Sequence, residues 1–216
     1  MSEVMVETCP LLTTGFYEKP RELMDTFIPV KIVKNYEDDE FLLEPIDPWE
    51  MKELCSLMMV RKQTKYPNPD FNDFDLKTEY IKTITPGKYI ERINNYINRF
   101  NGFTLTRGIF IHAIFIIMYK CKVIVTYYNF YKLLIISLNV SIKYLAETYE
   151  NNKFMARLGG IDLEDFNHLE RKFIDLIGWN LNAGSDFTEL CEGYKAYRGT
   201  DYLRDLIEST IPDFWA

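Results

Sequence analysis

The sequence contains few of the residues from which catalytic and metal sites are usually built. It has only two histidines and four cysteines in 216 residues. The cysteines Cys9, Cys55, Cys121 and Cys191 are widely spaced and form no CxxC motif, which predicts reduced thiols rather than disulfides or a zinc site. No nucleophile–base pair, phosphate-binding glycine loop or HExxH motif is present. We therefore expect no catalytic residue, no metal and no cofactor, and a protein that is not an enzyme.

The chain also lacks a basic charge balance and an apolar run long enough for a membrane. Its net charge is −7, which disfavours binding to nucleic acid or to an anionic membrane. The most apolar run, residues 108–118, has about half of the roughly 20 residues that a membrane span requires. No secretory signal is predicted at the N-terminus. These features, with the reduced cysteines, predict a cytoplasmic or nuclear protein whose partner is neither nucleic acid nor membrane.

Residues 1–84 differ in composition from the rest of the chain. They hold seven of the nine prolines and an acidic run at residues 37–40. One helix is predicted at residues 48–60, with Asp47 as its N-cap and Pro48 at the first helical position. We interpret this part as a partly ordered N-terminal extension.

From residue 85 onwards the pattern is helical, which predicts an all-α fold. The first helix is capped by Thr85 and has Pro86 in its first turn. It carries an apolar stripe with helical spacing. The stripe consists of Ile90, Ile93, Ile97 and Phe100. Arg92 lies off this stripe. Five helices are predicted within residues 85–182, followed by a C-terminal tail with short helices at residues 183–216.

The second and third helices are apolar on nearly all faces. The second begins after Thr104 or Thr106, and the third spans about residues 126–149. Both contain β-branched runs that resemble strands, but their length favours helices. We therefore predict a third helix that is buried among the others.

Two adjacent glycines, Gly159 and Gly160, predict a sharp corner between two helices. Glycine adopts positive φ without a Cβ clash, so the pair ends a short helix over residues 151–158. Asp162 then caps a fifth helix. The predicted buried stripe of that helix consists of Leu163, Phe166, Leu169, Phe173 and Leu176 or Ile177.

Two charged residues stand beside these apolar stripes. Lys143 lies in the third helix, where a lysine at the edge of a core extends its ammonium group to water. Glu170 lies in the fifth helix, where it could form an exposed pair with a neighbour on the same helix. The residues alone leave both interpretations open.

Four segments together resemble the cyclin box of the P-type (P/U) cyclins, and they span residues 85–181. They are KYIERINNY, VTYYNFYKLLIIS, NVSIKYLAETYENNKFMARLGGI and FNHLERKFIDLIGWNL. The last two are similar to the family patterns A-A-K-[FY]-x-[DE]-[DE]-x-[YF]-x-N-x-x-[YF]-x-x-[VL]-G-G-I and N-x-L-E-x-x-F-[LI]-x-x-[LI]-x-[FW]-x-L. The resemblance implies a single five-helix cyclin box.

The resemblance also implies a function for the two charged residues. In cyclins, the lysine of the third helix and the glutamate of the fifth lie together on the surface that meets a cyclin-dependent kinase. These positions correspond to Lys143 and Glu170. The implied partner is such a kinase, whose αC helix and activation loop the cyclin reorients. The alternative is a cyclin-fold scaffold or adaptor that binds a partner without activating a kinase.

One position departs from the family pattern. Many cyclins have an aspartate in the second helix that pairs with the arginine of the first helix. Here Met118 takes that place, so we expect Arg92 to pair with another carboxylate or the box to be less rigid.

Overall fold

The structure is a computed structural model, and it describes residues 39–65, 74, 84–99, 104–201 and 203–205. All of them belong to one compact unit, residues 35–216. In chain order the helices are α3 (Glu40–Leu43), α4 (Pro48–Lys65), α5 (Pro86–Ile97), α6 (Arg107–Phe115), the π-helical turn η2 (Ile116–Lys120), α7 (Phe130–Leu145), α8 (Asn152–Gly159), α9 (Leu163–Leu176) and α10 (Ser185–Tyr197). The described residues contain one isolated β-bridge, between Pro45 and Thr106. The fold is all-α, as predicted.

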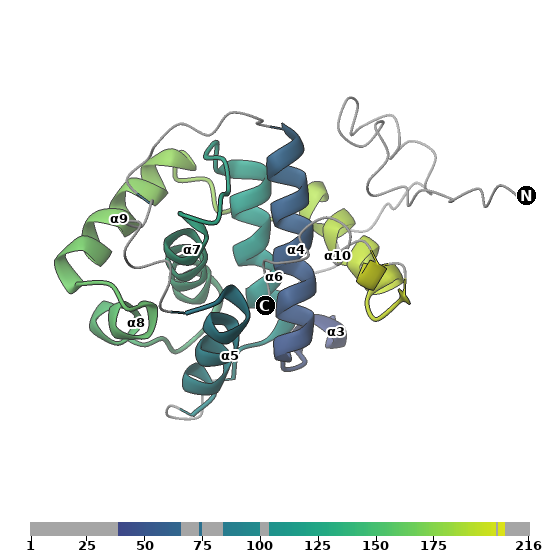
Figure 1. Ribbon diagram of the computed structural model, residues 1–216, viewed down its shortest axis with the longest axis horizontal. Coiled ribbons are helices and arrows are strands. Elements are labelled where there is room, and N and C mark those ends of the chain that lie inside the picture. The colour runs from purple at the N-terminus through teal and green to yellow at the C-terminus, as the bar shows by residue number, and fades with distance from the viewer. Residues whose placement is uncertain (1–38, 66–73, 75–83, 100–103, 202, 206–216) are drawn as a thin grey trace, which may run out of the picture. The chain divides into compact units, whose positions relative to one another are not determined.

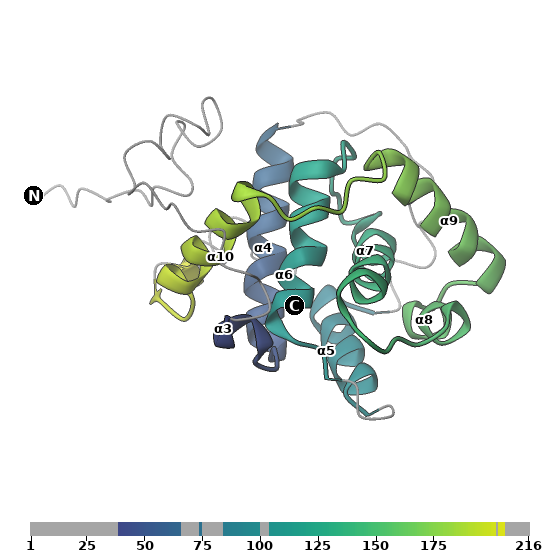
Figure 2. The same cartoon turned by 180° about the vertical axis from the view of Figure 1, so that it is seen from behind.

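Helix α7 is the central element of the domain. Every side chain from Leu133 to Ile142 is buried, and α6, α8 and α9 all pack against the helix. Figures 1 and 2 show α7 with α6 on one side and α8 and α9 on the other. Burying a large aliphatic side chain contributes about 1.5–3 kcal/mol, so this helix anchors the core.

Helix α7 is shorter than predicted, by four residues at each end. At its start, Asn129 stabilises a turn instead: its Oδ1 accepts from the Thr126 amide (2.8 Å) and its Nδ2 donates to the Ile124 carbonyl (2.7 Å). At its end, Ala146 is extended. The chain then reaches Asn151, whose side chain caps α8.

The second predicted helix forms, but its last turn is wider than an α-helix. Its N-cap is Thr106, whose hydroxyl accepts from the Ile109 amide, which decides between the two predicted caps. Over η2 the Cys121 amide donates to the Ile116 carbonyl (2.8 Å), the spacing of a π-helix. Met118 is buried in this turn.

The predicted stripes of the first and fifth helices are largely confirmed. In α5, capped by Thr85 as predicted, Ile90, Ile93 and Ile97 are buried, and Phe100 lies outside the described residues. In α9 the buried residues include Phe166, Leu169 and Phe173, and Ile177 follows them. Leu163 was wrongly assigned to this stripe. It is the first residue of the helix and is 38% exposed.

The two glycines of the corner serve different purposes. Gly160 has φ = 68° and ends α8 in the left-handed conformation, which favours glycine. Gly159 is still helical, and a Cβ there would lie 3.0 Å from Cγ2 of Ile135 in α7. The corner therefore needs Gly160 for its backbone angle and Gly159 for the close approach of α8 to α7. For Gly159, positive φ is not the reason.

Arg92 binds a backbone group rather than a carboxylate. Its Nη2 donates to the Arg157 carbonyl (2.9 Å), in the last turn of α8. A cation is favourable there because it meets the negative end of the helix dipole. Arg92 thus joins α5 to the end of α8, without the aspartate that Met118 replaces.

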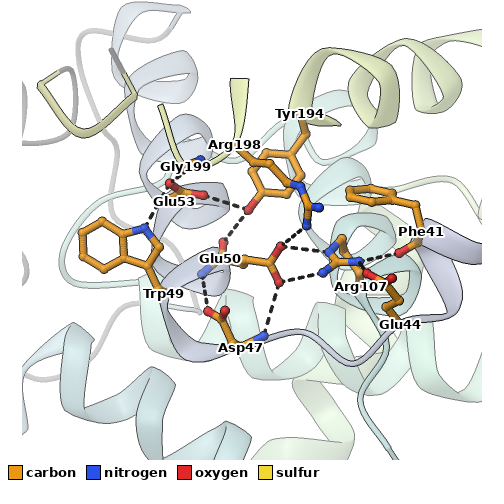
Figure 3. Close-up of polar contacts among 10 residues, drawn as sticks. All are labelled: Phe41, Glu44, Asp47, Trp49, Glu50, Glu53, Arg107, Tyr194, Arg198 and Gly199. Carbon is orange, nitrogen blue, oxygen red and sulfur yellow. Dashed lines mark hydrogen bonds and ion pairs between the residues drawn. The ribbon is translucent and has the colours of Figure 1, made fainter. Parts of the chain in front are cut away.

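Helices α3 and α4 lie in the segment predicted as an extension, yet they pack against α5 and α6. An ion-pair network ties them to the rest of the domain (Figure 3). Arg107 donates to both carboxylate oxygens of Glu50 (3.0 Å each) and to Glu44 (2.7 Å). Arg198 donates to the same Glu50 at 2.9 Å. The division of the chain at residue 84 stays a prediction.

Tyr194 extends this network to α10. Its hydroxyl donates to Glu53 Oε2 at 2.9 Å, and Glu53 also accepts from the Gly199 amide and the Trp49 indole. The buried carboxylates of α4 are thus neutralised or hydrogen-bonded by residues far apart in the sequence. Such compensation is required for buried charge.

We expect Gly159→Val and Gly160→Val to lower the melting temperature for different reasons. Overpacking at Gly159 costs roughly 1–3 kcal/mol, at about 2–4 °C per kcal/mol for a chain of this size. Adding Ile135→Ala makes room for the valine, so the Gly159→Val/Ile135→Ala pair should lose less than the sum of its single losses. In the Gly160→Val/Ile135→Ala pair, the two losses of melting temperature should simply add. Additive losses in both pairs would contradict the contact between Gly159 and Ile135.

We also expect Arg107→Leu to be far more destabilising than Arg198→Leu. Arg107 is buried and its removal leaves Glu50 under-compensated, which costs about 3–5 kcal/mol. The Arg198 side chain is 40% exposed, and pairs of this kind contribute about 1 kcal/mol or less. Urea denaturation measures both. Equal losses would show that water screens the Arg107–Glu50 pair.

Candidate functional site

Lys143 and Glu170 meet at the surface although they lie 27 residues apart. The Lys143 Nζ is 2.6 Å from Glu170 Oε1, and the side chains are 31% and 17% exposed. The ammonium group is therefore the more accessible member of the pair. From the residues alone, Lys143 was expected to extend into water and Glu170 to pair within its own helix. The structure shows instead that the two residues form a partly buried pair between helices.

Local structure explains why these two side chains converge. Lys143 lies in the last turn of α7, where the helix dipole favours a cation. Glu170 follows Leu169, which faces the core of α9, so the glutamate lies at the edge of the buried stripe. Because α9 packs against α7, that edge of α9 meets the end of α7.

Three asparagines complete the polar cluster around Glu170, and the sequence interpretation missed them. Asn139 of α7 donates to Glu170 Oε1 (2.6 Å), and Asn152 of α8 donates to Oε2 (2.8 Å). Asn152 also donates to Asn167 of α9 (2.7 Å). The signals in the sequence are an asparagine at position 139, within the apolar third helix, and Asn167, which stands at the asparagine of the N-x-L-E pattern.

A groove of about 550 Å³ opens beside the pair. Its lining combines charged, amide, aromatic and aliphatic side chains: Val140, Lys143, Tyr144, Asn167, Glu170, Arg171, Ile174, Trp179 and Leu181. Tyr144 is 45% and Trp179 is 74% exposed. Exposed aromatic side chains around a charged pair are typical of a protein-binding surface.

The backbone holds Trp179 in an unusual conformation. Its φ is 59°, in the left-handed region that side chains other than glycine and asparagine rarely adopt. The indole Nε1 donates to Asp175 Oδ1 at 3.1 Å. A strained residue that is also strongly exposed is a mark of a functional position.

The described residues offer little for catalysis or metal binding. No group of three His, Cys, Asp or Glu in these ranges could hold a metal ion. The Cys55 and Cys191 thiols are buried, and burial raises the pKa of both, which disfavours the reactive thiolate. No helix in the described part of the chain could cross a bilayer.

Comparison with known proteins identifies the family of this chain. The family model described as Cyclin matches residues 52–181. The chain belongs to the cyclin family.

Plant cyclins of the P and U types are among the relatives of this cyclin. It is 31% identical to Cyclin-U4-1 of Arabidopsis thaliana over 101 residues, which cover 47% of this chain and 49% of the relative. It is 30% identical to Cyclin-P4-1 of Oryza sativa subsp. japonica over 100 residues, 46% of each chain. It is 37% identical to PHO85 cyclin-6 of Saccharomyces cerevisiae over 54 residues, 25% of this chain and 13% of the relative. The chain thus spans about half the length of the plant relatives that it matches.

The other predicted positions support the site from a distance. Gly159 lets α8 approach α7, and Arg92 binds the end of α8. Helix α8 in turn supplies Asn152 to the carboxylate of Glu170. None of the three, Gly159, Gly160 or Arg92, lines the groove.

His112 fixes one wall of the groove of this cyclin. Its Nε2 lies 2.9 Å from the Leu181 carbonyl and its Nδ1 lies 2.8 Å from the Ser141 hydroxyl. Because a carbonyl only accepts, Nε2 carries the proton, and the neutral ring accepts from Ser141. The Tyr144 ring stacks on the imidazole, 5.5 Å between centroids. Burial lowers the pKa of His112, which favours this neutral form.

The lowered pKa of His112 predicts that this cyclin loses stability as the pH falls below 6.5. The unfolded chain binds a proton on His112 in that window and the native chain does not, so unfolding is favoured. His112→Gln should reduce the slope by up to about 1.4 kcal/mol per pH unit, as measured by urea denaturation between about pH 5.5 and 7.5. An unchanged slope in His112→Gln would contradict this assignment.

Proposed function

We propose that this cyclin is the regulatory subunit of a cyclin-dependent kinase and activates it. The observation that supports this best is the pairing of Lys143 with Glu170 beside an exposed groove. These are the two positions at which the cyclin resemblance implies kinase contacts. One relative is named as a cyclin of PHO85.

The chemistry of the groove beside Lys143 and Glu170 fits a helix of the partner and the loop that flanks it. Among the described residues, Lys143 donates only to Glu170, so two of its three N–H groups are free to bind backbone carbonyls of a partner. Trp179 and Ile174 offer apolar area beside the charged pair. A buried aromatic contact flanked by oriented polar groups is how interfaces obtain both affinity and specificity.

In this proposal the cyclin performs no chemistry, and no metal or cofactor takes part. Binding rotates the kinase αC helix inwards, where its glutamate pairs with the β3 lysine, and orders the activation loop. The cyclin shifts the kinase only as far as it binds the active conformation more tightly than the inactive one. A pre-formed surface on the cyclin serves this purpose because it selects one conformation of the partner.

The proposal predicts that exchanging the two charges strongly weakens kinase binding. The Lys143→Glu/Glu170→Lys variant can re-form the intramolecular pair, so circular dichroism should show a folded chain. It presents the opposite charges to the partner, so we expect roughly 10- to 100-fold less kinase to co-purify than with wild type. Mass spectrometry identifies the kinase, and phosphorylation of a basic peptide measures its activity.

The exchange Lys52→Glu/Glu91→Lys is the matched control. This pair joins α4 to α5 with a 2.9 Å contact and lies outside the groove. It should retain the kinase. A wild-type amount of kinase bound to the Lys143/Glu170 exchange variant would refute the proposed contact surface. A folded wild-type chain that captures a partner without kinase activity would favour a scaffold or adaptor.

A further inference from the structure

Asn139 is a buried amide in α7, the central helix of the domain. It is 1% exposed, and its neighbours along α7 are buried as well. Burying an amide is unfavourable unless hydrogen bonds compensate it, and an aliphatic residue of similar size would fill the space at lower cost. Core packing therefore does not explain why α7 has an asparagine at this position.

The hydrogen bonds of Asn139 lead to the candidate site. Its Nδ2 donates to Glu170 Oε1 at 2.6 Å and to Asn152 Oδ1 at 3.3 Å. Asn152 donates in turn to Glu170 Oε2 at 2.8 Å. With Lys143, three donors from α7 and α8 hold the two oxygens of one carboxylate on α9. We refer to Asn139 and Asn152 as the amide cradle.

Ser137, a second buried polar side chain of α7, makes its hydrogen bond within its own helix. The Ser137 hydroxyl donates to the Leu134 carbonyl in its own helix (3.0 Å). Its hydrogen bond joins no other helix and orients no charged group. Asn139 differs because both of its hydrogen bonds cross to other helices and one ends on a charged group.

We propose that Asn139 and Asn152 are positioning residues that fix the Glu170 carboxylate, and through it the Lys143 ammonium group, before a partner binds. A free glutamate and a free lysine would each lose rotamer entropy on binding. Here that ordering is completed in the unbound chain, which favours association. The amide cradle also donates hydrogen bonds to the Glu170 carboxylate. Lys143 therefore need not satisfy that carboxylate alone, and two of its N–H groups stay available to the partner. The partner as a kinase rests on the proposed function, whereas the cradle itself does not.

A purely structural role for Asn139 makes a different prediction. If the amide only joined α7 to α8, its loss would weaken the fold, and any effect on binding would be the same with or without a charge at position 170. A positioning role makes the effect depend on Glu170. The two roles can therefore be separated in a double-mutant cycle.

The first test uses the isolated full chain and needs no partner. In side-chain amide NMR spectra, the Asn139 NH₂ protons should be shifted downfield and slow to exchange with solvent. In Glu170→Gln they should move upfield and exchange faster, because the charged acceptor is lost. Asn139 protons that already behave like those of a solvent-exposed asparagine in wild type would overturn the cradle.

The second test measures affinity for the kinase that the wild-type chain captures. Asn139→Leu should weaken binding roughly 3- to 10-fold, the effect of one hydrogen bond to a charged group, without lowering the melting temperature. In a Glu170→Gln background the same substitution should change the affinity less than about 2-fold. Ser137→Ala, the matched control on α7, should bind as wild type does. Wild-type affinity in Asn139→Leu, or an equal loss in both backgrounds, would overturn the positioning role.

The two tests separate this inference from the proposed function. Failure of the chain to capture a kinase would refute the proposed function, and the NMR spectra would still decide whether the cradle holds Glu170. Conversely, a captured kinase whose affinity is insensitive to Asn139→Leu would leave the proposed function intact and refute the positioning role.

Discussion

The structure depends on the burial of α7 on nearly all of its faces. A helix that is apolar all round cannot lie at a surface, so other helices must cover it on several sides. Helices α6, α8 and α9 do so, and Gly159 permits the close approach of α8. The candidate site follows from this arrangement, because Lys143 is where α7 finally reaches the surface and Glu170 is at the edge of the helix that covers it.

Polar groups in the domain occur where helices have to be joined at defined positions. One such place is the network of Arg107, Glu50 and Arg198, which connects α4, α6 and the end of α10 (Figure 3). Another is the cluster around Glu170, which connects α7, α8 and α9. Apolar contacts tolerate small displacements, whereas charged hydrogen bonds have strict distances and directions. The second cluster lies at the groove and therefore orders the groups that a partner would meet.

The groove itself combines rigidity with exposure. Trp179 projects into solvent from a strained backbone, with its indole held by Asp175. His112 holds the Leu181 carbonyl behind it. A surface fixed in this way suits the function proposed above, in which the cyclin prefers one conformation of its partner.

Much of the fold could be predicted from the sequence, because it depends on local patterns. The stripe of Ile90, Ile93 and Ile97, the caps Thr85 and Asp162 and the left-handed Gly160 are all encoded within a few residues. The ends of α7 could not be read in this way. Asn129 holds the chain before α7 in a turn, through contacts to Thr126 and Ile124 that compete with helix propensity. Such competition has no clear signature in the sequence.

The sequence by itself determined the helices, the corner and the two charged residues that resemblance marks as a binding pair. Only the tertiary structure decided what these residues touch. It brought Asn139 and Asn152 to Glu170, gave Arg92 a carbonyl instead of a carboxylate and gave Gly159 a packing role. The physical reason is that periodicity specifies which face of a helix is buried, whereas hydrogen-bond partners depend on the distance between helices that are remote in sequence.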